Sequence, residues 1–409
     1  MSEQSRERSN YPIYLDCHAT TPVDRRVIEA MLPYFTERFG NPASINHAYG
    51  WEAEAAVKQA RETIAKSIGS GPEEIIFTSG ATEANNLAIK GVAEAYYTKG
   101  RHILTVATEH RAVLDPCLYL QKLGFEITFL PVEKDGVLNL DTFEKAIRPD
   151  TILASVMAAN NEIGILQPLA EIGAICRKHE VLFHSDAAQA IAKIPLDVEE
   201  ANIDLMSLTA HKVYGPKGIG ALYVRRRNPR VQLAAQIHGG GQEREMRSGT
   251  LYPPQIVGFG KAVELARRER EAERERVQRL RDRLWQQLQQ LEGIHLNGCS
   301  DRRLAGNLNI SVEGVDGSAL LLGLQSVAAL SSGSACTSTK TTPSHVLKAL
   351  GHPDDLAYAS LRFGIGRFNT EAEIDRVADA ALRTIRALRQ ANAPDAPPAP
   401  DAPDASKQN

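Results

Sequence analysis

The chain has 409 residues, with 47 lysines and arginines against 50 aspartates and glutamates. The net charge of -3 excludes a strong attraction to nucleic acid or to an anionic membrane, and we expect neither as a partner. The length and the 43% hydrophobic content are typical of a globular protein with one large and one smaller domain.

The cysteines and the N-terminus predict a cytoplasmic protein. The five cysteines are an odd number, and no two of them form a C-x-x-C motif. A disulfide framework is therefore not expected, and neither is a metal site. The first ten residues are polar, without the apolar stretch of a secretory signal, and no run of 18 apolar residues predicts a membrane span.

Strand-like and helical patterns alternate along the first half of the chain. Apolar, β-branched runs that stop at small or polar residues lie at 73–80, 102–110, 125–132, 151–161, 181–189 and 204–212. Helical patterns lie between them at 83–100, 111–124 and 168–180. This alternation predicts an α/β fold, with a mostly parallel sheet covered by helices on both faces. Ligands of such sheets gather beyond the carboxyl ends of the strands.

A long helix is predicted over 264–294 from an apolar stripe at spacings of three and four. The stripe consists of Val277, Leu280, Leu284, Leu288 and Leu291. The interspersed arginines and glutamates favour a solvated face over nucleic-acid binding. We expect this helix to link the large domain to a C-terminal one. The Pro/Ala/Asp-rich end, 393–409, predicts a disordered tail.

The residues that follow the strands carry the candidate chemistry. The small-residue turn at 79–82 enters a helix, whose positive end suits a phosphate. Asp186 ends an apolar strand, and Lys212 follows another, where partial desolvation would lower its pKa. Either residue alone is more often structural, but together with His110 they match the needs of pyridoxal phosphate. That cofactor requires an amine, a carboxylate, a flat stacking partner and a phosphate site.

Eight segments, in this order, resemble the NifS/IscS-type cysteine desulfurases, in the class V branch of fold-type I pyridoxal-phosphate enzymes. They are SGATEANNLAI, TEHRAV, NNEIG, HSDAAQ, TAHKVYGPKGIG, GGGQEREMRSGT, SSGSACTS and LRFGIGRF. The likeness runs from YLDCHATTPVD to about residue 390. It implies a large cofactor-binding domain over 24–265 and a small domain from 11–23 and 266–392 that carries a cysteine loop. We expect residues 1–10 and 393–409 to be disordered termini.

The resemblance implies a role for each matching residue. Lys212 would bind the cofactor's aldehyde, Asp186 its ring nitrogen and Gln189 its ring hydroxyl, while His110 would stack on the ring and assist proton transfer. The phosphate would be held by Ala81, Thr82, Thr209 and His211, and by Thr250 of the other subunit of a homodimer.

The implied reaction converts L-cysteine to L-alanine and leaves the sulfur as a persulfide on Cys336. This cysteine lies in SSGSACTS, a run of eight small residues. Asn161 and Arg362 would bind the substrate carboxylate. The sulfur would pass to an acceptor protein, such as an iron–sulfur scaffold. A mobile loop suits these two tasks, because the thiol must meet substrate inside the site and the acceptor outside it.

Two alternatives stay open at this point: another enzyme of the same fold, such as a selenocysteine lyase or an aminotransferase, and a scaffold without turnover. An aminotransferase needs no loop cysteine, and the set of Lys212, Asp186 and Arg362 argues against a scaffold. One departure concerns Cys17 and His18, which stand where the family commonly has Asn-like residues. Two such ligands do not make a metal site. The side-chain contacts that Cys17 and His18 make near the substrate pocket are not predicted.

Overall fold

The structure, a computed structural model, describes residues 11–332 and 343–392. Its larger sheet has seven strands in the order β2-β8-β7-β6-β5-β3-β4. These strands are β2 (Ile75–Thr78), β3 (His102–Val106), β4 (Glu126–Leu130), β5 (Thr151–Ser155), β6 (Leu182–Asp186), β7 (Leu205–Thr209) and β8 (Gly220–Val224). Only β8 runs antiparallel to its neighbours, β2 and β7. The predicted α/β fold with a mostly parallel sheet is therefore confirmed.

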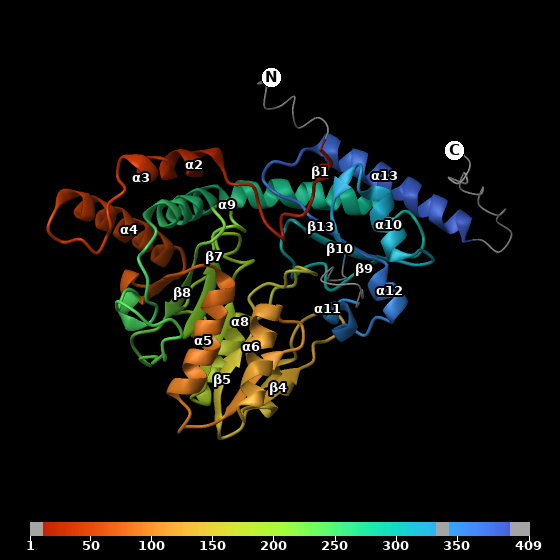
Figure 1. Cartoon of the computed structure of the whole chain (residues 1–409). Helices are drawn as coiled ribbons and strands as arrows, with labels where there is room; N and C mark the ends of the chain where they lie inside the picture. The colour runs from red at the N-terminus through yellow and green to blue at the C-terminus, as the bar shows by residue number, and fades with distance from the viewer. Residues whose placement is uncertain (1–10, 333–342, 393–409) are drawn as a thin grey trace, which may run out of the picture.

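Helices cover both faces of this sheet (Figure 1). One face packs on α5 (Ala81–Ala95) and α6 (Arg111–Lys122). The other packs on α4 (Ala48–Ser67), α8 (Leu169–Lys178) and the first part of α9 (Pro253–Leu288). Successive strand residues such as Ile76 and Phe77 point into opposite cores. Because both faces are buried, the strands are continuously apolar rather than alternating.

A smaller antiparallel sheet lies at the other end of α9, in the order β12-β13-β10-β9. Its strands are β9 (Ile294–Leu296), β10 (Asn307–Val312), β12 (Ser331–Ser332) and β13 (Ser360–Gly364). The C-terminal half of α9 packs on it together with α10 (Gly317–Leu324) and α13 (Glu371–Ala391). The N-terminal strand β1 (Ile13–Tyr14) joins this part of the molecule by pairing with β11 (Ala328–Ala329).

The long helix differs from its predicted bounds of 264–294. Helix α9 begins at Pro253, because the apolar residues before position 264 form a second buried stripe, including Ile256 and Phe259, on the large core. It ends at Leu288, and Ile294 belongs to β9, where it pairs with Val312. Residues 289–293 form a turn, and strand pairing takes Ile294, the last residue that the periodicity had assigned to the helix.

The remaining elements are short. They are α2 (Arg25–Met31), α3 (Pro33–Thr36), α7 (Leu140–Lys145), α11 (His345–Ala349), α12 (Asp354–Tyr358) and two 3-10 turns, η2 (Pro72–Glu74) and η3 (Glu243–Glu245). Within the described ranges, no helix combines the length and apolarity needed to cross a bilayer. The predicted domain boundaries stay a prediction. The termini predicted to be disordered, and Cys336, lie outside the described residues.

Candidate active site

A cavity of about 460 Å³ opens where the carboxyl ends of the parallel strands meet. The segments that line it follow β2, β3, β5, β6 and β7, and residues 19–20 lie on its wall. It brings together nine of the predicted site residues: Ala81, Thr82, His110, Asn161, Asp186, Gln189, Thr209, His211 and Lys212. These positions are spread over 132 residues of sequence, and the parallel sheet gathers them at one edge.

One end of the cavity suits an anion. Helix α5 begins after Gly80, and no side chain of the described residues caps its first backbone N–H groups. The turn at Gly80 packs directly against β8 because Gly220 has no side chain: a Cβ there would lie 2.7 Å from the Gly80 Cα. Beside the turn, Thr209 is buried, and the His211 Nδ1 lies 3.1 Å from the Thr20 hydroxyl. Burial lowers the pKa of His211 to about 4, so its ring is neutral near pH 7.

Asp186 is buried in the wall of the same cavity, with a hydrogen bond to each carboxylate oxygen. Its Oδ1 accepts from the Ala188 backbone N–H at 2.9 Å, and its Oδ2 accepts from the Asn85 side-chain amide at 2.7 Å. Lone pairs remain on both oxygens for a cationic N–H donor. Asn85 is a residue that sequence reasoning missed. The available signal was an amide on the stripe of α5 that otherwise holds small or apolar residues such as Ala84 and Ala88.

Lys212 directs its amine toward the N-terminal segment. Its Nζ donates to the His18 carbonyl oxygen at 2.9 Å, and the side-chain amide of Gln189 donates to the same oxygen at 2.8 Å. Burial, reinforced by the positive charge of Lys193, lowers the pKa of Lys212 to about 7. About half of such an amine is unprotonated at neutral pH, which is the form that reacts with carbonyl groups.

His110 caps helix α6 and is held by it. Its Nδ1 accepts from the Ala112 backbone N–H at 3.1 Å, so in the neutral ring the hydrogen is on Nε2. Burial lowers the pKa of His110 and favours that neutral form. The preceding residue, Glu109, is buried completely, which raises its pKa well above the usual range. Its Oε1 accepts from the Met157 backbone N–H, so its role is to hold the segments after β3 and β5 together.

Arg362 reaches the edge of the cavity from β13 in the smaller sheet. It donates to the Asn161 carbonyl oxygen at 2.9 Å and to the Asp16 carboxylate at 2.7 Å. Within the described residues, its buried Nε has no hydrogen-bond partner, and neither does the Asn161 side-chain oxygen. The two residues predicted to bind the substrate carboxylate are therefore neighbours, although Asp16 already neutralises part of the guanidinium charge.

Besides Arg362, which borders the cavity without lining it, two predicted residues lie elsewhere. Thr250 is exposed and lines a separate hollow near α4, together with Arg61 and Glu243. Cys336 lies outside the described residues. The described chain on either side of its segment ends close to the site, because Ser331 pairs with Arg362 and the His345 Nε2 donates to the Glu109 carbonyl oxygen.

Comparison with known proteins places the chain among related sequences and structures. The family model for class-V aminotransferases matches residues 13–377. A cysteine desulfurase IscS of Methylococcus capsulatus is 57% identical over 364 residues, covering 89% of this chain and 90% of the relative. A mitochondrial cysteine desulfurase of Arthroderma benhamiae is 56% identical over 376 residues, covering 91% and 74% respectively.

Solved structures give the same grouping. A NifS-like protein superposes with a TM-score of 0.85 at 38% identity, covering 92% of this chain and all of the neighbour. A structure described as SspA in complex with cysteine superposes with a TM-score of 0.78 at 39% identity, covering 88% of this chain and all of the neighbour.

The depressed pKa of Lys212 predicts an amine that reacts near neutral pH. Labelling of the ligand-free protein with acetic anhydride should modify Lys212 along a curve with a midpoint near pH 7, because only the neutral amine reacts. Mass spectrometry of the peptide that contains Lys212 measures the extent. A midpoint near pH 10, as for ordinary lysines, would contradict the burial argument.

Asn85→Leu should destabilise the protein by about 1–3 kcal/mol, because it removes a donor from a buried carboxylate. Urea unfolding of the cofactor-free protein at fixed concentration measures the loss. The same substitution in an Asp186→Ala background should cost clearly less. Equal costs in both backgrounds would mean that Asn85 does not act through Asp186.

Proposed function

The chain belongs to the aminotransferase class-V family and is a cysteine desulfurase, and we propose that pyridoxal phosphate and the residues of the cavity carry out its reaction. The observation that carries the proposal is the buried Lys212 amine, which lies in one cavity with Asp186 and an uncapped helix N-terminus. The reaction takes the sulfur from L-cysteine and leaves L-alanine.

The polar groups of the cavity fit the cofactor. The N-terminus of α5, with Thr82, Thr209 and His211, would hold the phosphate. Asp186 would accept from the protonated ring nitrogen, Gln189 would bind the ring hydroxyl, and His110 would lie against the ring. When bound, the cofactor supplies an aldehyde for amines and a ring that withdraws electrons from the adjoining carbon. Asp186 keeps the capacity for this contact because Asn85 and Ala188 use only part of its lone pairs.

Lys212 would move the proton. Once its amine is free, its pKa of about 7 lets Nζ take the α-proton of cysteine at neutral pH. The same amine would then return the proton to a different carbon atom. The His18 carbonyl oxygen holds Nζ in the cavity through a backbone atom, so the anchor does not depend on the side chain at that position. Arg362, with Asn161, would bind the substrate carboxylate and orient the α-carbon toward Lys212.

Cys336 would be the nucleophile that receives sulfur. Its thiolate attacks the substrate sulfur, an S–S bond forms, and the C–S bond of the substrate breaks. The three-carbon product gains protons and leaves as alanine, while the enzyme keeps a persulfide. We propose that an acceptor protein, such as an iron–sulfur scaffold, then takes this sulfur in the cytoplasm.

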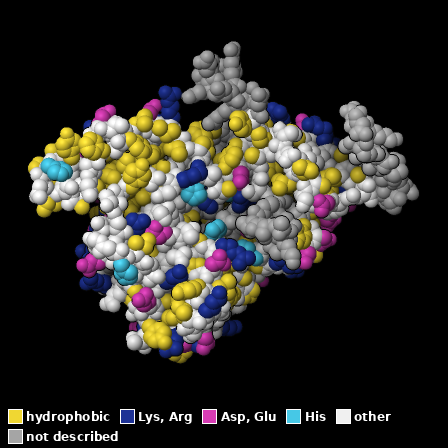
Figure 2. Space-filling model, viewed as in Figure 1, with side chains coloured by type: hydrophobic (Ala, Val, Ile, Leu, Met, Phe, Trp, Pro, Cys, Tyr) yellow, Lys and Arg dark blue, Asp and Glu magenta, His cyan; other side chains and the backbone are white. Residues whose placement is uncertain are grey.

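A homodimer is part of the proposal, and an apolar surface supports it. Figure 2 shows hydrophobic side chains gathered over α2, α3 and α4. The exposed residues include Leu32, Phe35, Phe39, Ile45, Tyr49, Trp51 and Tyr252. The ring centroids of Phe35 and Tyr252 lie 6.2 Å apart, and Tyr252 is two residues along the chain from Thr250. A patch of this extent is typical of an interface, and Thr250 at its margin could reach the cavity of a partner subunit.

Cys336→Ser should separate the early proton transfer from sulfur transfer. The variant should keep the yellow colour of the bound cofactor and its spectral change with cysteine, because both depend on Lys212. Alanine and sulfide should fall to background, since a hydroxyl is a poor nucleophile toward sulfur. Lys212→Ala is the matched control and should lose the colour, the spectral change and turnover together. Continued alanine production by the Ser variant would exclude Cys336 as the acceptor.

Arg362→Ala should raise the KM for cysteine about tenfold or more, because a charge-assisted pair to the substrate carboxylate is lost. Steady-state alanine formation measures the change. Arg283→Ala is the control: its guanidinium binds Asp375 on the surface, and its KM should match the unmutated protein. An unchanged KM in Arg362→Ala would show that the carboxylate is held elsewhere.

Charge placed on the apolar surface should break the dimer. Leu32→Glu combined with Tyr252→Glu should shift the protein toward monomer in light scattering, because two carboxylates would be buried at the interface. Leu322→Glu changes an equally exposed leucine on α10 and should leave the mass unchanged. A dimer that persists in the double variant would place the interface on another face.

A further inference from the structure

A second cavity lies directly behind the candidate active site. It has a volume of about 580 Å³ and is lined by the segments around residues 17–21, 192–195, 301–306 and 365–366 and by one side of α9. His18 lines this second cavity, Gln189 lines the active cavity, and the two side chains are hydrogen-bonded at 3.3 Å. The two spaces therefore share a wall that is one pair of side chains thick.

The second cavity contains a lysine that is paired with no acidic side chain in the part of the chain that the structure describes. Lys193 contacts the Gln189 side-chain oxygen at 3.3 Å, and across the described residues no carboxylate forms an ion pair with it. Burial lowers its pKa to about 8, and the negative charge of Glu273 opposes this shift. At neutral pH the amine is still mostly an ammonium ion. A partly buried ammonium without a carboxylate is costly unless another anion approaches it.

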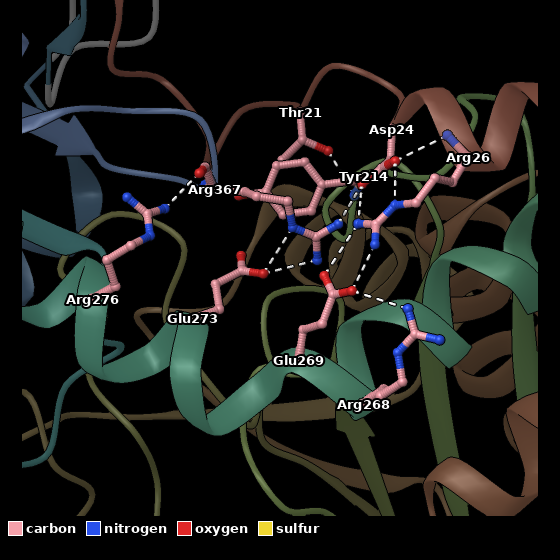
Figure 3. Close-up of polar contacts among 9 residues, drawn as sticks. All are labelled: Thr21, Asp24, Arg26, Tyr214, Arg268, Glu269, Glu273, Arg276 and Arg367. Atoms are coloured by element: carbon pink, nitrogen blue, oxygen red, sulfur yellow. Dashed lines mark hydrogen bonds and ion pairs between the residues drawn. The ribbon is translucent and has the colours of Figure 1, made fainter.

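Most acidic groups near this cavity are paired with arginines, as Figure 3 shows for α9 and the N-terminal segment. The exception, Asp301, is exposed and accepts a hydrogen bond from the Ser300 hydroxyl. Glu273 binds Arg367 at 2.8 Å, and Arg367 also binds Asp24 at 2.8 Å. At the mouth of the cavity, Glu271 is shared between two arginines of α9. The thiol of Cys17 cannot replace a carboxylate, since burial raises its pKa to about 12 and keeps it neutral.

The rest of the lining is largely apolar. Side chains of Val213, Val277, Leu304 and Ile365 face the space, and the volume is within the range of small-molecule sites. An occupant would therefore need an anionic group for Lys193 and an apolar body for these walls. We propose that this cavity is a binding site for a small organic acid, whose carboxylate pairs with Lys193 and whose hydrocarbon part packs between α9 and the 301–306 segment.

Ligand-observed NMR on the purified yellow holoenzyme tests this with hexanoate and hexan-1-ol, two probes of equal length that differ in charge. Hexanoate should bind about tenfold more tightly or better, because only its carboxylate pairs with the ammonium. In Lys193→Gln the preference should disappear, with hexanol binding unchanged. Arg274→Gln is the matched control on the same wall, and it should keep the preference because that arginine is already paired with Glu271.

Arg362→Ala tests whether the probe binds in the active cavity instead, because this variant lacks the arginine that would bind a carboxylate there. The preference for hexanoate should persist in this variant. The proposal is overturned if the two probes bind equally, if Lys193→Gln keeps the preference, or if Arg362→Ala abolishes it. Should Lys193→Gln fail to fold, the comparison of probes on the unmutated and Arg362→Ala proteins decides the outcome.

Discussion

The His18 carbonyl oxygen is the acceptor around which the candidate site is built. It receives hydrogen bonds from the Lys212 amine and from the Gln189 amide, two groups in the segments that follow β7 and β6 of the larger sheet. A neutral backbone oxygen orients the amine without stabilising its charge as a carboxylate would. Burial can therefore keep the pKa of Lys212 near 7 while the amine stays fixed in place.

The N-terminal segment can supply that oxygen only because both parts of the molecule hold it. Leu15 and Cys17 donate backbone hydrogen bonds to the Ala329 and Gly364 carbonyls of the smaller part, while Thr21 donates to the His211 carbonyl of the larger part. Arg367 adds side-chain bonds to Asp24 and to α9. Because one segment bridges both cores, a shift of the smaller part would also move the His18 carbonyl and the Arg362 guanidinium.

Buried charge is handled differently at each position near the site. Asp186 has two neutral donors and keeps lone pairs for a ligand, whereas Arg362 is shared between Asp16 and a carbonyl oxygen. Among the described residues, the Lys193 amine is hydrogen-bonded to one amide oxygen, that of Gln189. A buried charge whose hydrogen bonds are only partly satisfied costs free energy in the ligand-free protein. A bound ligand that completes those hydrogen bonds removes the cost, which is the usual compromise at functional sites.

The sequence by itself determined the α/β class, the parallel strands and the residues that follow them, because continuous apolar runs and strand-end polar residues are local patterns. It also predicted Lys212 and Asp186 as candidate site residues, because each follows or ends an apolar strand. Only the tertiary structure decided that Asn85 meets Asp186, that His18 anchors Lys212 and that Lys193 faces a second cavity. The first two contacts join residues 101 and 194 positions apart, and the third depends on an enclosed space, so no local periodicity encodes them. The end of α9 likewise depended on the pairing of Ile294 with Val312, a long-range contact that overrode the helical stripe.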